Sequence, residues 1–120
     1  METQNKRNYR ELEERTLEFS KKIIPHGKRI KKDVVNSEII KQVIRSDCSI
    51  GANYIEANEA LSKKDRSHRL RISRKEAKET GYWLDILKET SVENIEEVSA
   101  LQDETRELRN ILSAVIDKTK

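Results

Sequence analysis

The residues of this sequence best suited to do chemistry are basic side chains that recur at helical spacing. Five of them lie four, three, four and three residues apart, on one face of a helix: Lys64, His68, Arg71, Lys75 and Lys78. An earlier basic segment holds Lys28, Arg29, Lys31 and Lys32. Basic side chains at such spacing can follow the phosphates of a nucleic-acid backbone. We expect the helix face, with Arg66, to form a nucleic-acid-binding surface that the earlier segment extends.

Two other interpretations of this basic stripe remain open, namely an ordinary solvated helix face or a contact with another subunit. Residues 63–78 carry eight basic and two acidic side chains, whereas residues 85–107 carry eight acidic and two basic ones. Such segregation suits a polyanionic partner or a self-contact between basic and acidic faces. Aromatic side chains are absent from both basic segments, which favours recognition of the backbone or shape over stacking on bases.

No combination of residues typical of an enzyme occurs in the sequence. Neither His26 nor His68 has the Glu-x-x-His spacing of a di-iron bundle, and we expect both to lie exposed in basic patches. The single Cys48 excludes an internal disulfide and a cysteine-based zinc site, and its place on an apolar stripe predicts a buried structural thiol. Glycine-rich phosphate loops are missing as well. We therefore expect no enzymatic activity, no metal and no cofactor.

Long helices must position these side chains. The 120 residues include one proline and three glycines, and 39% of the residues are charged. A chain so poor in turn residues, with Leu, Ile and Val at helical intervals, favours helices. We predict one domain over residues 1–120, an all-α, antiparallel up-and-down four-helix bundle with helices at about 6–24, 37–61, 66–90 and 92–118. Pro25 should end the first helix, and Gly27 should follow in a turn.

Each predicted helix carries an apolar stripe at intervals of three and four residues, and we expect these stripes to form the core. The first helix has Tyr9, Leu12, Thr16, Phe19 and Ile23. The main stripe of the second helix is Ile39, Val43, Ile50, Tyr54, Ala57 and Leu61, and a neighbouring stripe is Ile40, Ile44, Cys48, Gly51 and Ile55. The third helix has Leu70, Ser73, Ala77, Gly81, Leu84 and Leu87. The fourth helix has Val98, Leu101, Thr105, Leu108, Leu112 and Val115.

The remaining face of the second helix is polar and holds Arg45, Ser49, Asn53 and Glu56. We expect these groups to form an interhelical network with Glu76 or Glu79 of the third helix, which would fix the register of the two helices. The alternative for this face is a ligand pocket.

A second apolar set on the third helix lies opposite its core stripe and consists of Ile72, Trp83 and Ile86. A lone bundle would leave these side chains in water, so we predict that they form a subunit interface. The alternative is that the third helix is central and buried on both sides.

Two runs of residues resemble the signatures of the bacterial four helix bundle protein family, also called the 23S ribosomal RNA intervening-sequence protein family. The first run covers residues 40–46 (IKQVIRS) and 49–57 (SIGANYIEA), and the second covers 62–65 (SKKD), 72–80 (ISRKEAKET) and 82–84 (YWL). The resemblance implies a four-helix protomer and a ring-shaped homopentamer. A distant relative, the accessory protein of diversity-generating retroelements, forms such a barrel and binds nucleic acid and a reverse transcriptase. The sequence departs from the family pattern at Ala57, Arg66 and Gly81, the last of which replaces a larger side chain.

Together these features predict a non-enzymatic, homo-oligomeric protein that binds nucleic acid, with RNA as the expected ligand. The alternative is a protein-interaction scaffold whose charged faces form subunit contacts without nucleic acid, and a separate protein partner is a further candidate. The longest apolar run is about three residues, far short of the ~20 that a membrane helix needs. No signal or transit peptide is visible, so we expect no membrane association and a cytoplasmic location.

Overall fold

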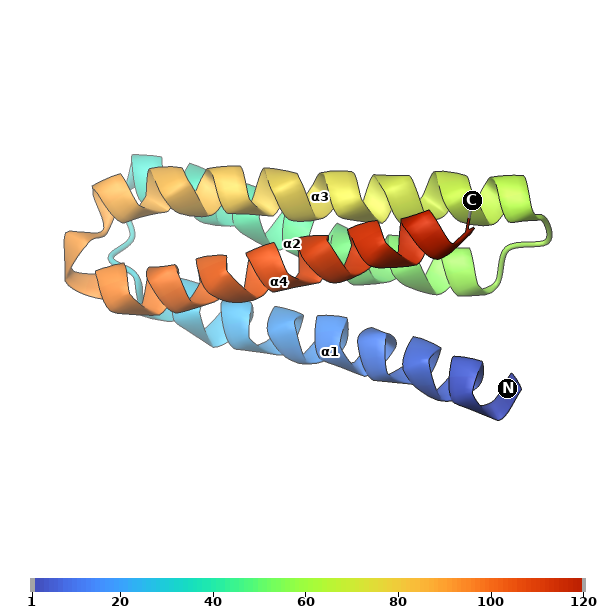
Figure 1. Cartoon of the computed structure of the whole chain (residues 1–120). Coiled ribbons are helices and arrows are strands. Elements are labelled where there is room, and N and C mark those ends of the chain that lie inside the picture. Colours follow the sequence, from blue (N-terminus) through green and yellow to red (C-terminus); the bar gives the residue numbers. More distant parts are fainter. Residues whose placement is uncertain (1, 120) are drawn as a thin grey trace.

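Four long helices form an antiparallel bundle in the computed structural model, which describes the backbone of residues 2–119 and the side chains of residues 10–119 (Figure 1). The helices are α1 (Glu2–Arg29), α2 (Val34–Asn58), α3 (Lys63–Thr90) and α4 (Ile95–Thr119), with a short 3-10 helix, η1 (Val92–Asn94), before α4. The α1–α2 connection and η1 lie at one end of the bundle, which we call the η1 end (Figure 1). The α2–α3 connection lies at the opposite end, which we call the terminal end (Figure 1). The predicted all-α four-helix architecture is confirmed.

Side-chain caps set the starts of α2 and α3. The backbone N–H of Asn36 donates to Asp33 Oδ1 at 2.7 Å, and the N–H of Asp65 donates to Ser62 Oγ at 3.0 Å. Because these caps bind N–H groups that the first turn leaves unpaired, both helices begin three residues earlier than predicted. At its other end α2 stops at Asn58, so Leu61 lies in the connection and is 101% exposed. The placement of Leu61 in the core was therefore wrong.

The prediction that Pro25 ends the first helix is also wrong, because α1 continues through Pro25 to Arg29. A proline inside a helix costs about 3 kcal/mol. The turn that follows Pro25 buries His26 and Ile30, which offsets this cost, while Pro25 itself faces solvent. Gly27 is a close-approach residue and not a turn residue, since a Cβ there would lie 3.1 Å from Ile40 Cγ2 of α2.

The predicted apolar stripes form most of the core. Buried positions include Leu12, Phe19 and Ile23 of α1, and the side chain of Tyr9 lies outside the described residues. The main stripes of α2 and α3 are buried as predicted, apart from Leu61 and Gly81, and in α4 Ile116 is more deeply buried than Val115. The tightest packing joins α2 to α3, whereas α1 touches α4 least and diverges from the other helices toward its N-terminus (Figure 1).

Hydrogen bonds inside the core fix how α2 and α3 meet. The Ser73 hydroxyl donates to the Ile50 carbonyl at 2.7 Å, and the Thr80 hydroxyl donates to Ser46 Oγ at 2.8 Å. All of these groups are buried, and an unpaired buried hydroxyl would cost about 1–3 kcal/mol. A shift of one helix along the other would break these bonds, so they specify the register.

The second stripe of α2 is only partly covered, because α1 lies over one side of it. Ile40 and Ile44 pack against the core, but Cys48 is exposed, which contradicts the expectation of a buried thiol. Cys48 lines a groove of about 480 Å³ between α1 and α2, together with Leu17 and Ile55.

Asp47 is buried beside this groove, with its side chain toward α1. The residue is 2% exposed, and its Oδ2 atom has no hydrogen-bond partner among the described residues. Burial raises the pKa of the Asp47 carboxyl from 3.8 to about 6, and the nearby Ser20 hydroxyl acts in the opposite direction. The neutral acid is therefore the form that this site favours.

We expect Asp47 to make the bundle less stable as the pH rises from about 4 to about 6. Its pKa is higher in the folded chain than in the unfolded chain, so the folded chain holds the proton more tightly. The resulting stabilisation, roughly 2–3 kcal/mol, is complete below the unfolded pKa and is lost as the pH passes the folded pKa. Urea unfolding at a series of pH values should show this loss for the natural chain relative to Asp47→Asn. Parallel pH profiles for the two proteins would contradict it; Asp103→Asn, at an exposed position, is the matched control.

Candidate nucleic-acid interface

The basic stripe of α3 faces solvent along its whole length. Lys64, His68, Arg71, Lys75 and Lys78 are all exposed. Arg71 Nε donates to the Ser67 hydroxyl of the preceding turn at 3.3 Å. Among the described residues, Lys64, Lys75 and Lys78 have no ion-pair partner, so their ammonium groups are open to an anion.

The second basic segment does not extend this stripe. Lys28 and Arg29 end α1, and Lys31 and Lys32 lie in the α1–α2 connection at the η1 end, whereas Lys64 begins α3 at the terminal end (Figure 1). The bundle is 48 Å long, and antiparallel packing places the two segments at its opposite ends. The expectation of one continuous surface is therefore wrong.

Several of the predicted basic residues already have partners within the protomer. Arg29 Nη2 lies 3.4 Å from Glu97 Oε2, and His26 Nδ1 lies 2.6 Å from the same oxygen. His26 is 4% exposed, so its expected place in an exposed basic patch is wrong. The hydrogen bond from His26 lowers the pKa of Glu97. At the terminal end, Arg66 Nη1 donates to the Ala57 carbonyl at 3.3 Å and to Asn58 Oδ1 at 3.1 Å, which ties α3 to the last turn of α2.

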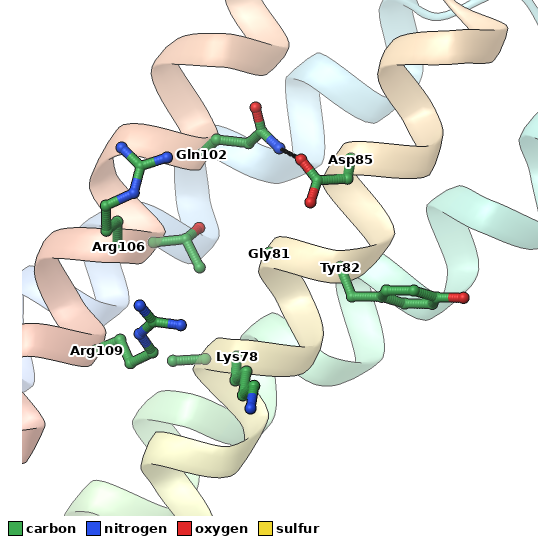
Figure 2. A pocket seen from close by; sticks show the side chains of 9 residues that line it. Lys78, Gly81, Tyr82, Asp85, Gln102, Arg106 and Arg109 are labelled. Atoms are coloured by element: carbon green, nitrogen blue, oxygen red, sulfur yellow. Dashed lines mark hydrogen bonds between the residues drawn. The ribbon is translucent and has the colours of Figure 1, made fainter.

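Two arginines of α4 join the α3 stripe instead. Arg106 and Arg109 border a groove of about 310 Å³ between α3 and α4, and Lys78 lies on its opposite wall (Figure 2). The complete lining is Ala77, Lys78, Gly81, Tyr82, Asp85, Gln102, Thr105, Arg106 and Arg109. Arg106 Nη1 pairs with Asp103 at 3.2 Å, and Arg109 has no ion-pair partner among the described residues. These groups make the α3/α4 groove cationic at one end.

Arg106 and Arg109 are not predicted by the charge pattern of the sequence, because the segment around them is acidic. In the bundle, α4 separates its charges onto two sides. Its acidic side meets α1: Arg15 Nη2 lies 2.8 Å from Glu104 Oε1 and 2.9 Å from Glu107 Oε2. The hydrogen bond with Arg15 lowers the pKa of Glu104. The sequence does contain a sign of the second, non-acidic side of α4. The residues that directly follow its core positions share one side of the helix, and they are Gln102, Arg106, Arg109 and Ser113.

The predicted polar network between α2 and α3 is present in part. Arg45 Nη1 lies 3.5 Å from Glu76 Oε2, and its other terminal nitrogen contacts Glu79. The Ser49 hydroxyl donates within α2 to the Arg45 carbonyl at 2.9 Å. Asn53 Oδ1 accepts from Arg69 Nη1 of α3 at 3.4 Å. Glu56 is exposed, and its carboxylate has no hydrogen bond to the other three groups of this face among the described residues. The network links the two helices.

The second apolar set of α3 is half-buried within the protomer. Trp83 and Ile86 pack against the core beside Ile40 and Ile44 of α2, and Ile72 is half-buried too. Trp83 Nε1 also donates to Glu79 at 3.0 Å. The premise that a lone bundle leaves these side chains in water is therefore wrong, because α2 covers this side of α3. A subunit interface at their remaining exposed surface stays a prediction.

Both the sequence and the structure of this chain are similar to those of a known protein family. Residues 9–114 match the profile of the family described as 23S rRNA-intervening sequence protein. This chain belongs to that family. A crystal structure of a protein with unknown function, from the S23 ribosomal protein family of Bacteroides thetaiotaomicron VPI-5482, is similar to it, with a TM-score of 0.77. The two sequences are 34% identical, and the similarity covers 88% of this chain and 97% of that one. No curated protein matched the sequence.

Membership of the 23S rRNA-intervening sequence protein family confirms the resemblance found in the two sequence runs. Gly81 is half-buried in the α3/α4 groove and is not part of the core stripe; Thr80 is buried instead. A Cβ at Gly81 would meet Thr105 Cγ2 at 3.9 Å, an ordinary contact, so a side chain larger than that of alanine would extend into the groove. Among the described residues, no helix is long and apolar enough to cross a membrane.

Proposed function

We propose that this member of the 23S rRNA-intervening sequence protein family is a non-enzymatic RNA-binding protein whose α3/α4 face contacts phosphates. The observation that carries the proposal is the position of cations without ion-pair partners on two neighbouring antiparallel helices, exposed on α3 and half-buried on α4. Lys75 and Lys78 of α3 and Arg109 of α4 have no ion-pair partner among the described residues. Cations arranged along a rod-shaped bundle suit the regular phosphates of a nucleic-acid helix.

The scaffold alternative has less support from the charges of the protomer. It requires acidic side chains that are free to meet the basic stripe of a second subunit. Three acidic residues of α4, namely Glu97, Glu104 and Glu107, already pair with α1 of the same chain. A homo-oligomer, which the family resemblance implies, remains compatible with RNA binding, since a ring would repeat the basic face around its axis. The name of the family refers to 23S rRNA, which makes structured RNA the first ligand to test.

Binding of a structured RNA should weaken steeply with salt. If the α3/α4 face contacts about four phosphates, the dissociation constant should rise roughly 100-fold between 50 mM and 200 mM salt. Fluorescence anisotropy with a labelled RNA hairpin at several salt concentrations measures this slope, and duplex DNA of equal length serves as the comparison. No binding at 50 mM salt, or binding that salt does not change, would rule out a phosphate-contacting face.

A further inference from the structure

The α3/α4 groove has two chemically different ends. Lys78 and Asp85 are seven residues apart on α3, as are Gln102 and Arg109 on α4, which corresponds to about 10 Å along each helix. Because the helices run antiparallel, Lys78 lies near the Arg109 end and Asp85 lies opposite Gln102 (Figure 2). The first end is cationic, and Arg106 stands on the α4 wall between the two ends.

The other end offers a hydrogen-bond acceptor that is already oriented. Gln102 Nε2 donates to Asp85 Oδ1, which holds the carboxylate in place. The second oxygen of Asp85 points along the groove toward Gly81 (Figure 2). A carboxylate repels phosphate and accepts hydrogen bonds from N–H and O–H groups, including the amino groups of bases. The two ends therefore select different parts of one ligand.

The floor between the ends is made of small side chains. Ala77, Gly81 and Thr105 line it, and the Thr105 hydroxyl is turned inward to the Leu101 carbonyl at 2.8 Å. The groove volume of about 310 Å³ lies at the lower limit of the ~300–1,000 Å³ typical of small-ligand sites. It is large enough for one nucleotide unit and too small for a duplex, and glycine at position 81 places no side chain in it.

We propose that the α3/α4 groove binds a single unpaired nucleotide, with its phosphate at Lys78, Arg106 and Arg109 and a donor group of its base or ribose at Asp85. The inference rests on the proposed function and names the part of the RNA that this site takes. RNA-binding proteins commonly read bulged or looped nucleotides, whose base edges are free of pairing. The α3 stripe then holds the flanking phosphates, and the groove holds the unpaired nucleotide between them.

The test compares two RNA hairpins that differ by one bulged nucleotide. The natural chain should bind the bulged hairpin about 10-fold more tightly than the fully paired one, as expected for a charged hydrogen bond gained. Gly81→Leu fills the groove and should remove this preference while keeping the affinity for the paired hairpin. Ala114→Leu places the same side chain at an exposed position of α4 and should keep the preference. Circular dichroism of each variant shows that the helices remain.

A second measurement examines the two ends of the groove separately. In NMR titrations, AMP should bind the natural chain about 10-fold more tightly than inorganic phosphate, and Asp85→Asn should reduce the affinity for AMP about 10-fold without weakening phosphate. Equal binding of AMP and phosphate, or a bulge preference that survives Gly81→Leu, would overturn the nucleotide site and leave salt-dependent RNA binding intact. AMP binding without any hairpin binding would reject the proposed RNA function and the RNA origin of the nucleotide.

Discussion

Reversing three charges of the α3 stripe should weaken RNA binding by at least ~100-fold at 100 mM salt. The variant Arg71→Glu/Lys75→Glu/Lys78→Glu removes three phosphate contacts and replaces each with a repulsive carboxylate. The slope of the logarithm of affinity against the logarithm of salt concentration should also fall by about 3, one unit for each lost contact. Anisotropy with the labelled hairpin gives both quantities. All three side chains are exposed, so the fold should tolerate the change.

The matched control reverses three charges at the η1 end, in the variant Lys28→Glu/Lys31→Glu/Lys32→Glu. It changes the net charge by the same amount at one end of the 48 Å bundle, whereas Arg71, Lys75 and Lys78 lie around the middle of α3. Because the Debye length is about 10 Å at 0.1 M salt, we expect less than ~5-fold weakening. Equal losses in both variants would mean that net charge, and not the α3 stripe, drives binding. Size-exclusion chromatography with light scattering completes the test: dissociation of an oligomer by the α3 variant alone would favour the scaffold.

Leu84→Ala should be among the most destabilising single substitutions in the bundle. Leu84 is 0% exposed on the core stripe of α3, the helix that packs against both α2 and α4. Truncating a buried leucine typically costs about 2–5 kcal/mol, a large part of the ~5–15 kcal/mol stability of a small domain. Alanine keeps the helix, so the loss comes from packing. Urea unfolding followed by circular dichroism measures it.

Leu61→Ala is the matched control for this prediction. It makes the same truncation in the α2–α3 connection, where Leu61 is 101% exposed, and should change the unfolding free energy by no more than about 0.5 kcal/mol. A loss at Leu61 as large as that at Leu84 would mean that a second subunit covers Leu61. A loss below about 1 kcal/mol at Leu84 would contradict the central position of α3.

Local patterns in the sequence predicted the helices well and their ends less well. The recurrence of Leu101, Leu108 and Leu112 identified the buried side of α4, because only a helix places such residues on one side. The first helix was predicted to end at Pro25 because proline removes a backbone hydrogen bond from a helix. The burial of Ile30 in the following turn outweighed this loss. The burial of Leu61 was predicted wrongly because α2 ends at Asn58, before this residue. That of Cys48 was predicted wrongly because an apolar stripe does not show how far neighbouring helices cover it.

The sequence predicted the part of the candidate site that lies on α3, and the structure added the part that lies on α4. Spacing along α3 placed Lys75 and Lys78 on a common exposed face, and the structure agrees. The charge pattern of the sequence did not indicate that Arg106 and Arg109 lie near these lysines. The net charge of a segment of α4 sums the residues on both sides of the helix. Glu104 and Glu107 dominate that sum, yet they face α1 and not the groove. Gly81 stood out as a departure from the family pattern, but its effect depends on Thr105 across the groove.

The sequence by itself determined the number of helices, their buried sides, the family and the basic face of α3. These properties depend on the helical period and on the order of residues, which a linear pattern contains. The tertiary structure alone decided which side chains meet across helices: Lys78 with Arg109, Asp85 with Gln102, and the acidic side of α4 with α1. The physical reason is that such meetings depend on the rotation and register of packed helices. Both are set by the core and by buried bonds such as that of Ser73 with Ile50.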